Sequence, residues 1–312
     1  MPGPSAHTLC ERIGFSDGHG YHPTFLPEVT LFRVAVHEGE CPLLHQSGLT
    51  FILQGHQVGS AGGREFSNGG DRYLILTGNL PLRCETPASN ETPVIGLHLG
   101  IDVTRLQRLV SILSDDLYWR RKTGSLPEQV VTSSRLDEHI SNSVAALIEV
   151  LHDPIASRAI GSATLTRLYF DVLRSEDGMV LASLTRNDSR LATVSAAMRY
   201  MEQHLHDKVG IEELVRIANM SRSAFHRAFK EVLGESPLQY LKQMRLNTAR
   251  NRITYEGQSV RLAAESVGYE STSQFSREFK RYFGIPPSRA GELPYSNRVG
   301  LRSYLSRTLD VV

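Results

Sequence analysis

The sequence predicts an α+β protein in which a strand-rich first half precedes an all-helical C-terminal region. Three observations carry this prediction. A phrase repeats at a spacing of 50 residues near the C-terminus, short β-rich runs occupy residues 48–101, and apolar residues at helical spacing follow Asp102. The chain of 312 residues is long enough for two separate cores.

The C-terminal repeat predicts two tandem helix-turn-helix units, at residues 211–232 and 259–282. In each copy the phenylalanines recur every fourth residue, so they lie on one face of a helix and can be buried together. Six identities share one offset: Phe225, Arg227, Phe229, Lys230, Gly234 and Pro237 return as Phe275, Arg277, Phe279, Lys280, Gly284 and Pro287.

The opposite face of each predicted helix is polar and cationic. Such side chains suit a helix that enters the major groove, where hydrogen-bonding groups meet base edges and cations meet phosphates. Two ordinary hairpins with a solvated basic face are the alternative, and the matched register of the copies disfavours it. The proposed DNA-binding residues are Arg222, Ser223, His226, Arg227 and Lys230 in the first copy, and Thr272, Ser273, Ser276, Arg277 and Lys280 in the second.

A turn precedes each of these helices and a third helix joins the copies. Asn219 and Gly268 suit the left-handed backbone that such turns require. Ser236 and Pro237 predict the start of a linking helix, because they form an N-cap followed by proline at the first helical position. If it runs from Pro237 to Ile253 it is about 25 Å long. Such a spacer can hold two recognition helices roughly one DNA turn, about 34 Å, apart.

These segments resemble the DNA-binding domain of the AraC/XylS family of bacterial transcription regulators. The similarity is carried by residues 219–230 (NMSRSAFHRAFK), 236–240 (SPLQY) and 267–280 (VGYESTSQFSREFK). It implies base readout by Ser223, His226 and Arg227 in the first helix. In the second helix it implies readout by Thr272, Ser273, Ser276 and Arg277. Ser223 is a departure, because some members carry a larger residue at this position.

Charge divides the chain in the same place. Residues 190–312 carry 19 basic and 12 acidic side chains, whereas residues 1–189 carry 15 and 21. A basic module beside an acidic one is expected when only one part contacts nucleic acid. The sequence therefore predicts double-stranded promoter DNA as partner of the C-terminal part alone.

The first half predicts a small antiparallel barrel or sandwich followed by helices. The clearest strands are Leu49 to Leu53, Tyr73 to Thr77 and Val94 to Ile101, with Gly, Asn and Pro clusters between them. Apolar helical spacing then runs from Leu106 to Leu117 and continues from Leu136 through Val172. The run from Ile140 to Leu151 fits either a dimer seam or packing on the barrel, and the second interpretation is favoured.

The strand-rich half also resembles the cupin-like N-terminal region of one AraC-type subgroup, and the two similarities together span about residues 24–291. This resemblance implies a regulatory domain that senses a small molecule of unknown identity or mediates association. The predicted organisation is a regulatory domain at 1–185, a DNA-binding domain at 191–291 and a tail at 292–312. The polar segment Ser183 to Arg190 is the expected boundary.

The strand at residues 94–101 suggests where an effector could bind. Its alternation places Ile95, Leu97, Leu99 and Ile101 on a core face. The other face carries His98 between two glycines, which leave space and can mark close approach of a ligand. The alternative is that this face meets solvent or a covering helix.

Catalysis is disfavoured, and we expect neither a cofactor nor a metal. The histidines considered in the strand-rich region, at positions 37, 45, 56 and 98, lack the His-x-His and Glu arrangement of a cupin metal site. Gly-x-Ser-x-Gly, phosphate-loop and Cys-x-x-Cys motifs are absent from the sequence. A metal-dependent barrel enzyme and a dimeric adaptor that no longer reads bases remain the alternatives.

Three irregularly spaced cysteines, Cys10, Cys41 and Cys84, predict no disulfide framework. With no apolar run of about 18 residues and no signal-like start, the chain is expected to be cytoplasmic and to have no membrane partner. Cys41 and Cys84 could react with an electrophile, but unreactive buried thiols are the favoured interpretation. A homodimer is expected, and RNA polymerase is a further candidate partner.

Overall fold

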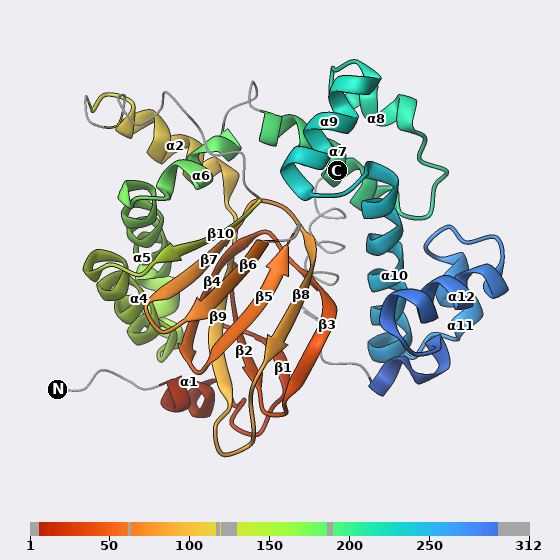
Figure 1. Ribbon diagram of the computed structural model, residues 1–312. Coiled ribbons are helices and arrows are strands. Elements are labelled where there is room, and N and C mark those ends of the chain that lie inside the picture. The colour runs from red at the N-terminus through yellow and green to blue at the C-terminus, as the bar shows by residue number, and fades with distance from the viewer. Residues whose placement is uncertain (1–5, 62–63, 117–118, 120–129, 186–189, 293–312) are drawn as a thin grey trace.

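A computed structural model of the protein describes residues 6–61, 64–116, 119, 130–185 and 190–292 (Figure 1). Its first part is a curled antiparallel sheet with helices against one side, and its last part is entirely helical. The predicted fold class is therefore confirmed. The boundary residues 186–189, the tail from 293 onward and Leu117 lie outside the described residues.

The strands pair in the order β1-β2-β9-β4-β7-β6-β5-β8-β3, and β10 pairs with β7. Every pairing is antiparallel. The strands are β1 Gly20–Pro23, β2 Val29–Val34, β3 Glu38–His45, β4 Gly48–Gln54, β5 His56–Ala61, β6 Arg64–Gly69, β7 Arg72–Leu76, β8 Leu80–Thr86, β9 Val94–Gly100 and β10 Val131–Arg135.

The three strands read from the sequence are present as β4, β7 and β9, but the sheet begins earlier than expected, at Gly20 rather than Gly48. β2 is buried along its whole length and so shows no alternation of polar and apolar residues. The expected turn at Ser60 to Gly63 also starts too early, because β5 continues to Ala61. The glycines at 69 and 70 do form a turn, and both have positive φ angles, 110° and 66°.

One face of the sheet packs against helices of the first half. Asp102, Asp137 and Asp153 cap the N-termini of α2, α4 and α5 with their side chains. The apolar face of α4 lies in the core shared with β4, β7 and β9, where Ile140, Leu147 and Leu151 are fully buried. The apolar residues read as a possible dimer seam are thus buried within the chain itself, in a core that α4 shares with the sheet. The helices are α1 Ala6–Ile13, α2 Val103–Leu113, α4 Glu138–Leu151, α5 Pro154–Arg174 and α6 Gly178–Ala182.

The C-terminal part consists of α7 Arg190–Gln203, α8 Ile211–Ile217, α9 Arg222–Leu233, α10 Pro237–Glu256, α11 Val260–Glu265 and α12 Thr272–Phe283. Short 3-10 turns, η1 Ser183–Thr185 and η2 Pro287–Glu292, flank it. The linking helix α10 starts at the expected residue but runs three residues further than Ile253, up to Gly257 with its φ of 67°. Within the described chain, no helix is long and apolar enough to cross a membrane.

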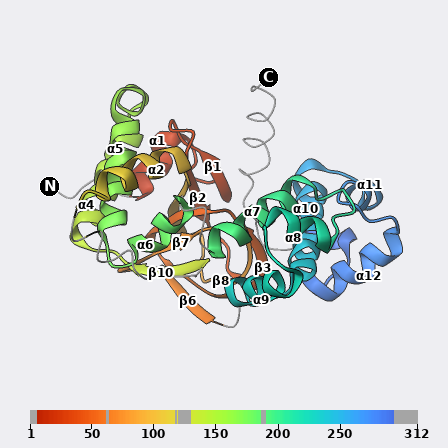
Figure 2. The ribbon, with the colours of Figure 1, turned by 90° about the horizontal axis from the view of Figure 1, so that it is seen from above.

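The helical part is docked on the other face of the sheet. Phe66, Leu74, Leu76, Leu80 and Leu82 share one apolar core with residues of α7, α8, α9 and α10. A second, smaller shared core joins Cys41 and Leu43 of β3 to α10, α11 and α12. Figures 1 and 2 show α10 standing beside β3 and β8, with the other C-terminal helices around it.

Candidate nucleic-acid interface and regulatory cavities

The first candidate recognition helix, α9, is defined at both ends by its own residues. Ser221 caps the N-terminus by accepting a hydrogen bond from the Ala224 amide at 3.3 Å. Gly234 ends the helix with a φ of 79°, a conformation that favours glycine. Phe225 and Phe229 are completely buried, which leaves the opposite face outward. The outward residues include all five predicted ones, with Arg222, Ser223, Arg227 and Lys230 exposed and His226 half-buried.

The second candidate helix, α12, repeats this construction. Ser271 accepts a hydrogen bond from the Gln274 amide at 3.3 Å, and Gly284 ends the helix with a φ of 81°. Phe275 and Phe279 are completely buried. On the other face Ser273, Arg277 and Lys280 are exposed, and Thr272 and Ser276 are half-buried. Each helix thus brings its predicted residues onto one accessible side.

Backbone geometry fixes the turn before each recognition helix. Asn219 has a φ of 49°, and among the described non-glycine residues it alone has a positive φ. Gly268 has a φ of 83°, and a side chain there would meet the His206 carbonyl oxygen at 2.7 Å. Both turns therefore have the left-handed backbone that the sequence predicted. Gly268 is required for a second reason, because the backbone after α7 leaves no room for a Cβ atom.

The exposed faces of α9 and α12 each carry a stripe of polar and cationic side chains. Most of the cations in these two stripes have no partner within the described protein and are accessible to DNA. Arg227, Lys230, Arg277 and Lys280 have no ion-pair or hydrogen-bond partner among the residues that the structure describes. Arg222 differs, because its guanidinium lies 3.2 Å from a carboxylate oxygen of Glu212 on α8. Base or phosphate contacts by the four free cations would break no existing pair. The DNA contacts themselves stay a prediction.

The seam between the sheet and the helical part contains a buried polar network that the sequence did not reveal. The Tyr240 hydroxyl donates to the Asn79 carbonyl oxygen at 2.7 Å and to a Glu202 carboxylate oxygen at 3.1 Å. The Asn79 amide donates to the other Glu202 oxygen at 2.8 Å. Burial raises the pKa of Glu202 to about 7. Three elements, the β7–β8 turn, α7 and α10, thus meet at one carboxyl group.

His98, the predicted effector contact, faces the inside of the curled sheet. Its Nδ1 lies 3.1 Å from the Thr50 hydroxyl, and its buried Nε2 has no partner among the described residues. Burial lowers the pKa of His98 to about 4, so the ring is neutral at physiological pH. The core face of β9 is as predicted, with Ile95, Leu97 and Leu99 fully buried.

The space expected around His98 is mostly filled. The sequence interpretation assigned room to Gly96, but a Cβ atom there would meet the Phe32 ring at 2.3 Å. The cavity at His98 has a volume of about 20 Å³, which is on the scale of one water molecule. His98 therefore lines a small enclosed space, and its role as an effector contact stays a prediction.

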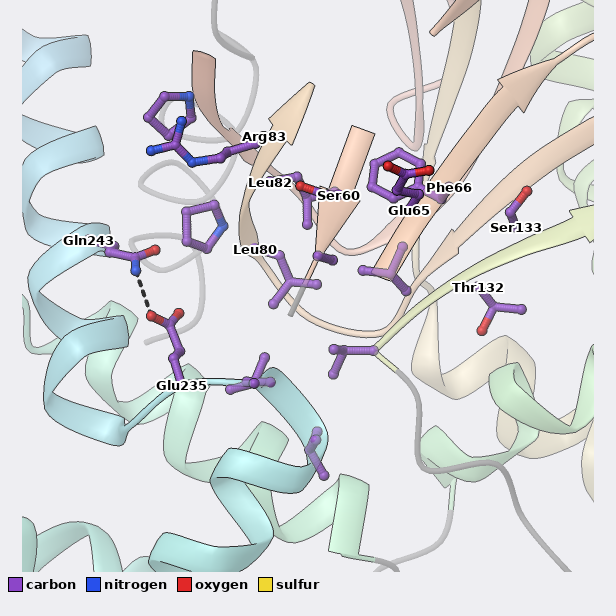
Figure 3. Close-up of a pocket in the computed structure, with 18 of the residues that line it drawn as sticks. Ser60, Glu65, Phe66, Leu80, Leu82, Arg83, Thr132, Ser133, Glu235 and Gln243 are labelled. Carbon is purple, nitrogen blue, oxygen red and sulfur yellow. Dashed lines mark hydrogen bonds between the residues drawn. The ribbon is translucent and has the colours of Figure 1, made fainter. Parts of the chain in front are cut away.

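A far larger cleft lies at the seam between the sheet and the DNA-binding helices. Its volume is about 1030 Å³, and its walls come from β5, β6, β8 and β10 on one side and from α9 and α10 on the other (Figure 3). Its rim is charged, and its base includes the largely buried apolar side chains Phe66, Leu80 and Leu82. The walls of this cleft come from separate parts of the chain, so neither segment alone predicts it.

The cysteines are all buried and free. Cys41 and Cys84 are direct partners across β3 and β8. Burial raises the pKa of both thiols, which keeps them protonated and supports the interpretation as unreactive side chains. Within the described residues no group of three or more His, Cys, Asp or Glu side chains could hold a metal ion.

This arrangement, a curled antiparallel sheet docked on two helix-turn-helix units, defines a class of transcription regulators. A family model described as the AraC-type transcriptional regulator N-terminus matches residues 25–180, and a helix-turn-helix domain model matches residues 214–292. Because the first match spans half of the chain, the protein belongs to the family of AraC-type transcriptional regulators. The resemblance read from the sequence is confirmed, and so is its implication that the protein is a DNA-binding transcription regulator.

Individual relatives agree. The raffinose operon transcriptional regulatory protein RafR of Pediococcus pentosaceus is 27% identical over 70% of this chain and 74% of its own length. The RCS-specific transcriptional activator RclR of Escherichia coli is 39% identical, but over 33% of this chain and 35% of its own length. A solved structure of ToxT from Vibrio cholerae aligns with a TM-score of 0.60 at 13% identity, covering 86% of this chain and 97% of that one. This last similarity shows the fold alone.

Proposed function

We propose that the protein reads two successive major grooves of promoter DNA with α9 and α12. The supporting observation is the pair of unpartnered arginines, Arg227 and Arg277, at equivalent positions of two exposed stripes. Figure 1 shows the two helices near opposite ends of α10. The 20 residues of α10 correspond to about 30 Å, which is close to one turn of DNA.

The test compares specific with nonspecific binding. A cognate site is first selected from random duplexes with the full-length protein. Arg227→Ala or Arg277→Ala should then weaken the selected site by about 1 to 3 kcal/mol while changing affinity for random DNA much less. Arg158→Ala, an exposed arginine on α5, is the matched control and should leave both affinities unchanged. Equal losses on both kinds of DNA, with an intact circular dichroism spectrum, would contradict base readout.

We further propose a division into a regulatory domain at 1–185 and a DNA-binding domain at 191–291, acting in the cytoplasm where promoter DNA lies. The regulatory domain is proposed to form a homodimer. The apolar face of α4 is buried within the chain and cannot form the dimer contact. The proposal is supported by two exposed apolar side chains of α5, Ile155 and Ile160, which are 68% and 53% accessible. RNA polymerase remains a candidate partner of the promoter-bound protein.

Sedimentation of the full-length protein tests the dimer. Ile160→Asp should shift the monomer–dimer equilibrium toward monomer, because a charge in an apolar contact is costly to desolvate. Ile112→Asp, equally exposed but on α2, is the control and should not shift it. A wild-type protein that stays monomeric at micromolar concentration contradicts the proposal.

An effector site at His98 is proposed for a conformation in which the space inside the curled sheet, next to this side chain, is wider than in the structure. The support is the enclosed ring with an unpartnered Nε2. A thermal-shift screen of metabolites, aldehydes and aromatic acids would find ligands of this site. The substitution His98→Ala should lower their affinity for the protein. A stabilising ligand whose affinity is unchanged in that variant excludes His98 as a contact.

A further inference from the structure

The cleft at the seam contains a carboxylate that lacks a positive partner. Glu235 lies in the turn between α9 and α10, half-buried on the cleft wall. Its one hydrogen bond among the described residues comes from the Gln243 side-chain amide on α10, at 2.5 Å (Figure 3). Within the same part of the chain no Lys, Arg or His forms an ion pair with it. Burial raises the pKa of Glu235 to about 7, and no neighbouring cation lowers it.

The internal repeat shows that this turn does not need a carboxylate. Gly234, Glu235 and Pro237 correspond to Gly284, Ile285 and Pro287 fifty residues later. Both turns follow a recognition helix that ends at a glycine with positive φ. The same backbone is therefore built with an apolar side chain at the equivalent position. A carboxylate at this position therefore has a desolvation cost that the turn itself does not require.

Five apolar side chains lie at the base of the cleft beside Glu235, although most of the exposed lining of the cleft is polar. Leu80 and Leu82 of β8 point into the cleft in Figure 3, and Phe66 of β6 lies across from them. Val232 and Leu233, from the last turn of α9, complete this surface. These five side chains are 2 to 9% exposed, so they form a small apolar patch at the base of a cleft whose volume of about 1030 Å³ is at the upper end of the range of small-molecule pockets.

Three of the other charged side chains that line the cleft are engaged, whereas Glu65, Arg135, Glu176 and Lys230 are exposed on its rim. Arg72 donates to the Ser133 hydroxyl at 2.8 Å, and Arg83 lies 3.9 Å from Glu40. Glu231 is paired with Arg190 at 3.0 Å. Glu235 therefore stands out as the buried charge next to the apolar floor that has no counter-ion.

We infer that this cleft is a binding site for an organic cation with an apolar body, an aliphatic or aromatic amine whose ammonium group pairs with Glu235 while its body covers the floor formed by β8, β6 and the end of α9. Such a ligand contacts the sheet and the DNA-binding helices together. The site is separate from the lumen at His98, and it does not depend on how α9 and α12 read DNA.

Calorimetric titration of the full-length protein tests the site without DNA. The probes are hexylamine, hexanol and hexanoate, which share one apolar chain and differ in the charge of the end group. Hexylamine should bind with a dissociation constant on the order of 1 mM. Hexanol and hexanoate should bind at least about tenfold more weakly, which corresponds to the loss of one partly buried ion pair.

Two variants locate the binding. Glu235→Gln keeps a hydrogen-bonding group beside Gln243, and Glu235→Ile copies the residue of the second repeat, so both should fold. Each should weaken hexylamine at least about tenfold and reduce its preference over hexanol. Glu149→Gln, an exposed carboxylate on α4 that does not line the cleft, is the matched control and should bind hexylamine like the wild type.

Three outcomes overturn the proposal. They are no binding of hexylamine up to about 10 mM, equal binding of the amine and the alcohol, or full binding in the folded Glu235 variants. Tighter binding of hexanoate than of hexylamine would assign the cleft instead to anions, at the exposed cations of its rim.

Discussion

The two helix-turn-helix units have matching sequences but are attached to the sheet differently. The first shares a core with six residues of β6, β7 and β8, whereas the second touches the sheet through Cys41 and Leu43 of β3. The seam network joins the sheet to α7 and α10, which pack against the first unit, and the cleft is lined by three residues of the first unit but by one, Tyr282, of the second. The same recognition geometry can therefore be coupled strongly or weakly to the regulatory part, depending on the residues outside the repeat.

The largest expected effect tests this difference through equivalent core residues. Phe229→Ala and Phe279→Ala should each destabilise the protein by about 3 to 5 kcal/mol, because both side chains are completely buried. Chemical unfolding followed by Trp119 fluorescence reports on the core of the sheet and its own helices, where Trp119 is buried. Phe229→Ala should lower the midpoint of this transition more than Phe279→Ala. Equal changes of the midpoint in the two variants would mean that both helix-turn-helix units are coupled to the sheet to the same extent.

A medium effect is expected for Glu202, the carboxyl group buried at the seam, on the pH dependence of the free energy of unfolding. An acid with a raised pKa binds more protons when folded, so its contribution to stability is complete at low pH and is lost as the pH rises through about 7. Relative to Glu202→Gln, the wild type should lose up to about 3 kcal/mol of unfolding free energy between pH 4.5 and 7. Taking the difference between the two proteins cancels the opposite contribution of buried His98. A difference that does not vary with pH would show that Glu202 is not buried as the structure indicates.

The smallest effect separates the stripes themselves. Arg222 is already paired with Glu212, and the equivalent residue of the second unit is Thr272. Arg222→Ala should therefore cost less than about 1 kcal/mol of DNA affinity, equally on all sequences, and reduce the salt dependence by about one charge. Glu212→Gln should instead raise the affinity for DNA, because it removes the carboxylate that pairs with the Arg222 guanidinium. A sequence-dependent loss in Arg222→Ala would make this residue a base reader.

The helical elements and the exposed stripes could be predicted because their signals are local. Ser221, Ser236 and Ser271 each accept a hydrogen bond from the backbone amide three residues further on, which caps α9, α10 and α12. Gly234 ends α9 and Gly284 ends α12. The end of α10 at Gly257 carried the same signal, which the interpretation of the linker overlooked. Local signals also identified β4, β7 and β9, where apolar runs are bounded by turn residues.

The seam and its cleft could not be predicted, because their contacts join distant parts of the chain. Tyr240 bonds to Asn79 across 161 positions, and neither residue is unusual in its own segment. The space at Gly96 was misjudged for the same reason, since Phe32 fills it from a neighbouring strand. One difference between the repeats lies at the cleft and can be read in the sequence: Glu235 stands where the second copy has Ile285, next to Ser236 in place of Pro286.

The shared apolar core at the seam also has a thermal consequence. Separating the sheet from α7, α9 and α10 would expose Leu74, Leu76, Leu80 and the side chains that cover them to water. Hydration of apolar surface carries a large positive heat capacity, so the free energy that holds the two parts together is curved in temperature and weakens on cooling. The freedom of the first recognition helix to move against the sheet is thus tied to temperature by the composition of the surface that it covers.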